Sequence, residues 1–238
     1  WFGPKMVWLP KEDAQSKARL LKALHKFCDV VSADEAGLPP DDVFQEEFFE
    51  LTREQRHAIN NVQCTESLPV TRYCFEHQVA QGFLKGNEFE ASQTFKNEKV
   101  ARIVELAEEH PAMLIFARYN GQIHAIAEAL RKKGHTVGVL TGDTKDREAV
   151  VRDSDILVCN TALGEGWESP RFSFIVFASL PWSVVEWEQC RGRASRVNVP
   201  LRRTYVVFTC RDSIDEDVKE SLDNKKDFLI ELYAKTRS

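Results

Sequence analysis

From about residue 96, apolar residues follow two alternating patterns along the chain. Between Val100 and Ala107 they are spaced three and four apart, which predicts a helix that ends before Pro111. The unbroken apolar run 112–117 then predicts a buried strand. The alternation continues, with helices predicted at 123–130, 146–151 and 184–191, and strands at 136–140, 156–159, 174–178 and 204–209. Five short apolar strands separated by helices predict an α/β fold, a doubly wound parallel sheet with helices on both faces.

The first part of the chain has a different pattern. It is helix-like at 14–31, 53–62 and 73–84, strand-like at 43–51, and broken by loop signals at 37–40 and 82–87. We therefore expect two regions: a partly helical extension over residues 1–95, and the α/β domain over residues 96–238. One or two further helices are predicted at 214–233.

Composition and charge narrow the class of protein. Hydrophobic residues make up 43%, and no apolar run approaches the roughly 20 residues that a membrane helix needs. The start of the chain lacks the layout of a secretory signal, so we expect a cytoplasmic protein. Residue 1 is Trp rather than Met, so we expect a piece of a longer protein. The net charge of −5 argues against coating of nucleic acid by bulk electrostatics, so any such contact must be local.

The six cysteines form no CxxC pair, which favours reduced thiols. Two His–Cys spacings of three, His25 with Cys28 and Cys74 with His77, would place both side chains on one helix face as metal ligands are placed. Both pairs lie in apolar-rich helical patterns, where Cys usually packs as a small core residue. We therefore predict no metal site.

The segment Gln189–Arg196 carries three arginines within six residues, beside Gly192. Guanidinium groups are planar multiple donors suited to phosphate oxygens. A solvated basic patch is the alternative interpretation. About 25 residues upstream, a loop with Gly164 and Gly166 follows a predicted buried strand. Glycines there permit a close approach of backbone N–H groups to phosphate, although an ordinary surface turn is the alternative.

These segments together resemble the motifs of superfamily 2 helicases, in the same order along the chain. Gln189, Arg193 and Arg196 match the QxxGRxxR pattern of motif VI. The stretch 158–170 resembles motif V, 114–118 resembles motif IV, and 140–144 resembles the phosphate-contacting turn between them. Alone, the last two are weak, since apolar strands and TGD turns are common.

Other stretches are similar to the Swi/Snf-like translocases. They are Ser179–Ser183 with its Pro-Trp pair, Leu38–Pro40 followed by Glu50–Gln55, Thr94–Lys99, and Asp212–Glu216. The sequence departs from that group after motif VI, where Val197-Asn198-Val199 replaces its RxGQ continuation, and at Glu168, where many relatives have Asp or Asn.

The resemblance implies a RecA-like second lobe of an ATP-driven motor. Arg193 and Arg196 would then be catalytic arginine fingers. Nucleotide contacts would come from Gln189, Gly164, Gly166 and Glu168. ATP and Mg²⁺ would be bound mainly by a first lobe of the same polypeptide, because this sequence has no GxxxxGK[ST] phosphate loop. The Asp34-Glu35-Ala36 stretch, which is similar to a DEAx box, is interpreted as an ordinary acidic loop.

The same resemblance implies contacts to duplex DNA through backbone phosphates, since a motor must step over any sequence. The residues implied are Phe116, Arg118, Thr141, Gly142, Asn160 and Thr161. The expected activity is that of an ATP-dependent helicase or translocase, with no turnover by this lobe alone. Two alternatives stay open: a non-catalytic helicase-like scaffold, and a lobe of an RNA helicase.

Overall fold

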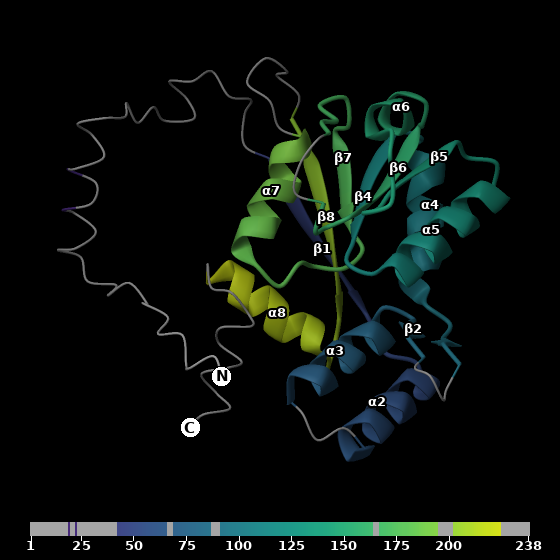
Figure 1. Ribbon diagram of the computed structural model, residues 1–238, viewed down its shortest axis with the longest axis vertical. Helices are drawn as coiled ribbons and strands as arrows, with labels where there is room; N and C mark the ends of the chain where they lie inside the picture. The colour runs from purple at the N-terminus through teal and green to yellow at the C-terminus, as the bar shows by residue number, and fades with distance from the viewer. Residues whose placement is uncertain are drawn as a thin grey trace, which may run out of the picture. The chain divides into compact units, whose positions relative to one another are not determined.

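A six-stranded parallel sheet forms the centre of the protein (Figure 1), as seen in a computed structural model that describes residues 19, 22, 42–65, 69–86, 91–163, 167–194 and 202–224, without the side chains of 62–65. The strand order is β1-β8-β7-β4-β6-β5, and every neighbouring pair is parallel. The strands are β1 (Val43–Phe49), β4 (Met113–Ala117), β5 (Val137–Leu140), β6 (Ile156–Asn160), β7 (Phe174–Phe177) and β8 (Thr204–Cys210). All of them lie in the second of two compact units of the chain, Trp1–Leu38 and Pro39–Ser238.

Helices cover both faces of this sheet. Because side chains alternate along a strand, Leu114 and Phe116 of β4 enter one core, and Met113, Ile115 and Ala117 enter the other. The second core packs against α4 (Glu98–Glu109) and α5 (Asn120–Lys132), and the first against α6 (Arg147–Arg152), α7 (Val184–Ala194) and α8 (Ile214–Asp223). The predicted doubly wound α/β fold is therefore confirmed.

The strand β1 corrects the predicted division of the chain. It lies at the edge of the main sheet, paired in parallel with β8 from Val43↔Thr204 to Phe49↔Cys210. Glu47 of β1 accepts two hydrogen bonds from Arg102 of α4, at 2.8 and 3.0 Å. The α/β sheet therefore begins at Val43 rather than after residue 95. The error arose because β1 precedes the alternating region in sequence but pairs with its last strand.

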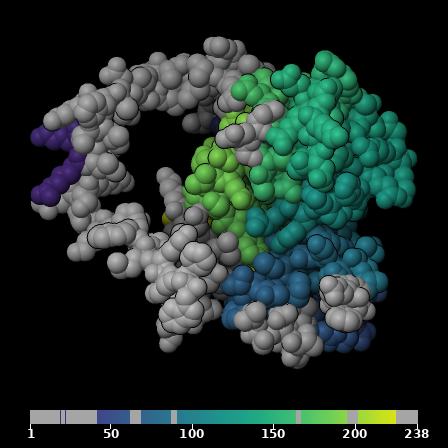
Figure 2. Space-filling model, viewed as in Figure 1, coloured from purple at the N-terminus to yellow at the C-terminus, as the bar shows by residue number. Residues whose placement is uncertain are grey.

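The helices α2 (Arg53–Thr65) and α3 (Pro69–Ala80) form a pair beside the carboxyl ends of the strands (Figure 1). Leu51 and Ala80 bury against Cys210, the last residue of β8. In Figure 2 these blue helices form one continuous surface with the helices of the sheet. The short strands β2 (Phe83–Leu84) and β3 (Gln93–Thr94), which the periodicity did not predict, connect the pair to α4.

Gly82 ends this helical pair with a tight turn. Its φ of +90° lies in the left-handed region, and an added Cβ would stand 2.6 Å from Nδ2 of Asn97. Asn97 needs that space, because its Nδ2 donates to the carbonyl of Gln81 at 2.6 Å and its Oδ1 accepts from the Lys99 amide as the N-cap of α4. The turn therefore places the start of α4 directly against the end of α3.

A buried ion pair lies where α3, α4 and α8 meet. Nζ of Lys99 is 2.7 Å from Oδ2 of Asp215, and both residues are buried. The same carboxylate accepts from the side chain of Gln81 at 2.8 Å and from the amide of Cys210 at 3.0 Å. Although burial by itself raises the pKa of a carboxyl, the Lys99 charge and His77 hold the pKa of Asp215 below its usual range. The pair is thus charged, and both partners also bond to Gln81.

Three cysteines of the sheet and its helices are packed in the core. Cys159, Cys190 and Cys210 are free and buried, and burial raises the pKa of each thiol, that of Cys210 to about 11.

In the part of the chain that the structure describes, no helix is both long and apolar enough to span a membrane.

We predict that Lys99→Met lowers the free energy of unfolding by about 3–5 kcal/mol, because it leaves the Asp215 carboxylate buried without its charged partner. Urea denaturation monitored by circular dichroism measures this change. Lys219→Met is the matched control, since its partners Glu46 and Asp223 are partly exposed, and it should cost about 1 kcal/mol or less. Equal losses for the two variants would contradict a special role for the buried pair.

Candidate nucleic-acid and nucleotide contacts

Several of the predicted nucleic-acid contacts lie together at the carboxyl edge of the sheet. Arg118 follows β4, Asn160 ends β6, and Thr141 follows β5, and these three strands are neighbours. Nδ2 of Asn160 donates to the carbonyl of Arg118 at 3.1 Å, and the amide of Thr161 donates to the carbonyl of Ala117 at 3.1 Å. This is the edge at which ligands of doubly wound sheets usually bind.

Within this group the side chains differ in accessibility. An added Cβ at Gly142 would meet nothing within 4 Å, so its backbone is open to a ligand. Thr141 and Thr161 are buried, at 7% and 2% exposure, and the carbonyl of Thr161 already accepts from Sγ of Cys190. Phe116 is 1% exposed and packs with Phe177 and Trp167 in the core, so its predicted contact with nucleic acid is corrected. The resemblance implied Phe116 and Arg118 of motif IV as contacts, but helices cover both faces of the sheet, so all of β4 is buried and only Arg118, after its end, is partly exposed.

Arg118 is held from several sides. Its guanidinium lies over the ring of Trp182, 4.8 Å from the centroid, and Nη1 is 3.3 Å from Oε2 of Glu186 on α7. Its backbone amide donates to Oγ of Ser179 at 2.8 Å. The side chains of Arg118 and Glu186 remain 24% and 31% exposed, so solvent, or a ligand, can reach the pair.

Trp182 is in turn fixed by His77 of α3. The indole Nε1 donates to Nδ1 of His77 at 3.1 Å, and the hydroxyl of Tyr119 lies 2.9 Å from the same nitrogen. An indole N–H can only donate, so Nδ1 is an acceptor and the ring proton is on Nε2, which faces Oδ1 of Asp215 at 3.1 Å. His77 is therefore a neutral ring connecting Trp182 to the buried ion pair. Its ring nitrogens are engaged in this way, which leaves none for the metal considered with Cys74.

Burial lowers the pKa of His77, although the neighbouring Asp215 opposes the shift and Arg118 and Lys99 add to it. A proton at Nδ1 would also break the bond from Trp182. The electrostatics and the hydrogen bonds therefore both favour the neutral ring.

This depressed pKa predicts a pH dependence of stability. Below about pH 6.5 the unfolded chain protonates His77 and the folded chain does not, so stability present above that pH is lost as pH falls. The free energy of unfolding, measured by denaturant titration between about pH 7.5 and 5.5, should fall with pH by up to about 1.4 kcal/mol per pH unit from this residue. His77→Gln should flatten the profile, whereas His124→Gln, on the exposed side of α5, should retain it. An unchanged profile in His77→Gln would disprove the assignment.

The predicted nucleotide contacts lie elsewhere on the lobe. The helix α7 runs back from the end of β7 toward the start of β8, where the carbonyl of Ala194 accepts from Nε of Arg203 at 2.7 Å. At this end Nη1 of Arg193 donates to the carbonyl of Trp167 at 3.2 Å, and the amide of Ser169 donates to the carbonyl of Arg193 at 3.1 Å. The Arg193 guanidinium also lies 5.8 Å from the Trp167 ring centroid.

The other members of the predicted nucleotide group are only partly described. Gln189 is exposed on α7, and Glu168 is exposed beside Trp167. Gly164, Gly166 and Arg196 lie outside the described residues, as do His25, Cys28, the Asp34-Glu35-Ala36 stretch, the predicted helix 14–31 apart from residues 19 and 22, and the chain after residue 224. A hollow of about 360 Å³ adjoins Glu168 and Trp167 and is bordered by Glu148, Arg152 and Arg171.

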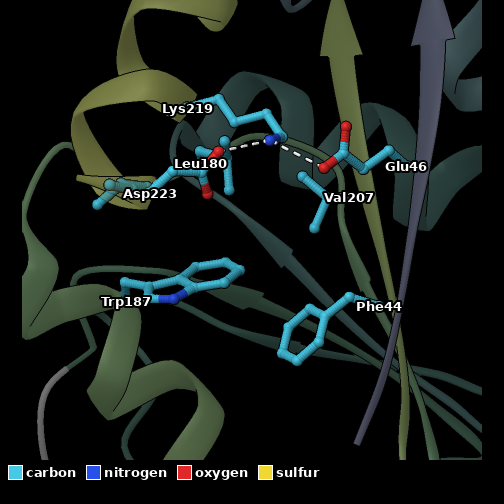
Figure 3. A pocket seen from close by; sticks show the side chains of 8 residues that line it. Phe44, Glu46, Leu180, Trp187, Val207, Lys219 and Asp223 are labelled. Carbon is cyan, nitrogen blue, oxygen red and sulfur yellow. Dashed lines mark hydrogen bonds and ion pairs between the residues drawn. The ribbon is translucent and has the colours of Figure 1, made fainter. Parts of the chain in front are cut away.

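A third feature involves none of the predicted site residues. Between α7, α8 and β1 lies a groove of about 270 Å³ (Figure 3). Trp187 and Phe44 line it, and Lys219 bridges Glu46 and Asp223 at 2.8 and 2.7 Å above them. The groove is mostly apolar, and its charged groups are already paired.

Sequence reasoning missed the residues that hold the arginines in place. Trp182 was noted only as part of a Pro-Trp stretch, and His77 only as a doubtful metal ligand. Glu186 gave no signal at all, because its pairing with Arg118 spans 68 positions. A contact of that sequence separation exists only once the sheet has formed.

Comparison with known proteins agrees with this fold. Residues 96–198 match the family described as helicase conserved C-terminal domain. The C-terminal part of the Fun30 ATPase domain superposes with a TM-score of 0.62 at 12% identity, over 77% of this chain and 89% of that one. The Sulfolobus solfataricus SWI2/SNF2 ATPase C-terminal domain gives 0.56 at 16% identity, over 78% and 86%. No curated protein sequence matches significantly.

The S. solfataricus SWI2/SNF2 ATPase core, solved in complex with double-stranded DNA, superposes with a TM-score of 0.61 at 17% identity over 90% of this chain. This chain spans 51% of that core, about half its length. Residues 96–198 are therefore similar to the helicase conserved C-terminal domain, in a match that covers less than half of the chain. The chain has the RecA-like fold of the C-terminal lobe of SWI2/SNF2 ATPases, which confirms the resemblance seen in its motifs.

Proposed function

We propose that this chain is the C-terminal lobe of an ATP-dependent DNA helicase or translocase, which completes an ATP site on a first RecA-like lobe of the same polypeptide. The observation that carries the proposal is the state of Arg193. Its Nη1 and backbone carbonyl are held by the segment Trp167–Ser169, while its Nε is buried and has no hydrogen-bond partner among the described residues. A buried donor left unpaired costs about 1–3 kcal/mol, and a phosphate oxygen would satisfy it.

The residues at this end of α7 fit a nucleotide bound between two lobes. Arg193, and with it Arg196, would donate to the γ-phosphate and stabilise the negative charge that develops during its transfer. Gln189 and Glu168 are exposed on the same part of the lobe and would contact the nucleotide together with Gly164 and Gly166. Mg²⁺ and most of the ATP would be held by the first lobe. The described residues include no group of three or more His, Cys, Asp or Glu suited to a metal ion.

The carboxyl edge of the sheet would contact the tracked DNA. Arg118 would supply the charge there, and Gly142 and Asn160 would offer accessible polar groups beside it, whereas Thr141 and Thr161 are too buried for direct contact. Contacts of this kind bind phosphates without reading bases, which suits movement over any sequence. Arg118 pairs with Glu186 on the first turn of α7, and Arg193 lies on the last turn. Closure of the two lobes would therefore couple nucleotide binding at one end of this helix to DNA binding at the other. The expected cytoplasmic location stays a prediction.

Arg193→Ala should lower the kcat of DNA-stimulated ATP hydrolysis by about 10³-fold or more in the protein that carries both lobes, because the transition-state charge loses a donor. A coupled phosphate-release assay measures this. The nucleotide affinity of Arg193→Ala should change little. Arg171→Ala is the control and should hydrolyse ATP normally, because the Arg171 guanidinium donates to the carbonyls of Val151 and Ser154. Normal hydrolysis by Arg193→Ala, or none by the intact protein, would support a non-catalytic scaffold.

Arg118→Ala should weaken binding of duplex DNA and reduce the slope of log K against log salt concentration by about 1, since one phosphate contact is lost. Fluorescence anisotropy over a series of salt concentrations measures both quantities. Arg131→Ala, on the last turn of α5, is a charge-matched control and should retain the slope. Comparing duplex DNA, single strands and RNA in the same assay separates a DNA translocase from an RNA helicase.

A further inference from the structure

We propose that Trp182 is the positioning residue for Arg118, and that His77 keeps its indole ring in place. The inference rests on the proposed DNA contact of Arg118 and deepens it. It concerns a side chain that would not touch the nucleic acid itself.

The first step is the surface that Trp182 offers. Trp182 is buried, and the guanidinium of Arg118 lies over its ring at 4.8 Å from the centroid, within the range of a cation–π contact. The indole thus contacts the guanidinium of Arg118 from the buried side. The carboxylate of Glu186 contacts it from the solvent side, with Oε2 at 3.3 Å from Nη1.

The second step is the fixed orientation of the indole. Its N–H donates to His77 Nδ1 at 3.1 Å, and the two ring centroids are 5.4 Å apart. His77 is fully buried, and its Nε2 faces Asp215, which Lys99 holds at 2.7 Å. A rotation of the indole would therefore break a hydrogen bond inside a charged, water-excluded cluster, where an unpaired polar group is costly.

The third step is the difference between the two side chains that contact Arg118, Trp182 and Glu186. A phosphate can displace the carboxylate of Glu186, because that ion pair is partly exposed and screened by salt. It cannot displace the buried indole. Arg118 would therefore exchange Glu186 for a phosphate while staying on Trp182, and a pre-organised side chain loses less conformational entropy on binding.

The test is a double-mutant cycle on duplex DNA affinity, in the protein that carries both lobes. Trp182→Leu, Arg118→Ala and the double variant are compared by fluorescence anisotropy at two salt concentrations. Trp182→Phe retains an aromatic face and the packing. Trp187→Leu is the matched control, because Trp187 also packs on the sheet, against Phe177 at 4.4 Å, but lines the groove of Figure 3. Circular dichroism and melting temperature verify the fold of each variant.

We expect Trp182→Leu to weaken binding about fivefold, the size of a partly exposed cation–π contact, and to have no further effect when Arg118 is already Ala. Trp182→Phe should restore part of the affinity, and Trp187→Leu should bind normally. If Trp182→Leu does not fold, the Trp182→Phe cycle decides, with a smaller loss that also disappears without Arg118.

Two outcomes would overturn the inference, and they differ in what else they overturn. In the first, Arg118→Ala weakens DNA binding, but Trp182→Leu has no effect or weakens binding equally with and without Arg118. Trp182 then does not act through Arg118, while the proposed DNA contact stands. If Arg118→Ala itself binds duplex DNA normally at both salt concentrations, the proposed contact fails, and the positioning role fails with it.

Discussion

The buried ion pair between Lys99 and Asp215 holds together three segments that are far apart in sequence. Lys99 lies in the first turn of α4, Asp215 in the first turn of α8, and both bond to Gln81, which directly follows α3. Charges in the core require full pairing, so the pair tolerates only one mutual placement of these segments. Through His77 the same pair orients Trp182, and through Trp182 it reaches Arg118 at the surface. The α2–α3 pair is thus tied to the edge where we propose that DNA binds.

Two kinds of arginine environment separate the proposed tasks of the lobe. Arg118 has an exposed carboxylate partner that a phosphate can replace, which suits a contact made and broken at every step. Arg193 is held by backbone groups and retains a buried donor that no described residue pairs with, which suits a ligand delivered from outside the lobe. These environments differ because α7 passes from one end of the sheet to the other, with Glu186 on its first turn and Arg193 on its last.

The buried strands and most helix positions were predictable because each reflects a local rule. An apolar run of four or five residues between turn signals is typical of a buried strand, and α4 and α5 have apolar residues at helical spacing. The predicted residues Arg118, Thr141 and Asn160 do meet at one edge, since parallel strands bring their carboxyl ends together. Phe116 was misjudged because helices cover both faces of the sheet, so every residue of β4 is buried and only the residue after it, Arg118, is partly exposed.

The sequence by itself thus determined the α/β class, the order of the motifs and the arginines that carry the proposed chemistry, all of which depend on neighbours within a few residues. The tertiary structure alone decided that Val43–Phe49 joins the sheet, that Glu186 faces Arg118 and that His77 connects Trp182 to Asp215. These contacts join residues 68 to 161 positions apart, and no local pattern encodes such a pairing. Their physical reason is the packed sheet itself, which brings distant polar groups into a space without water, where each must find a partner.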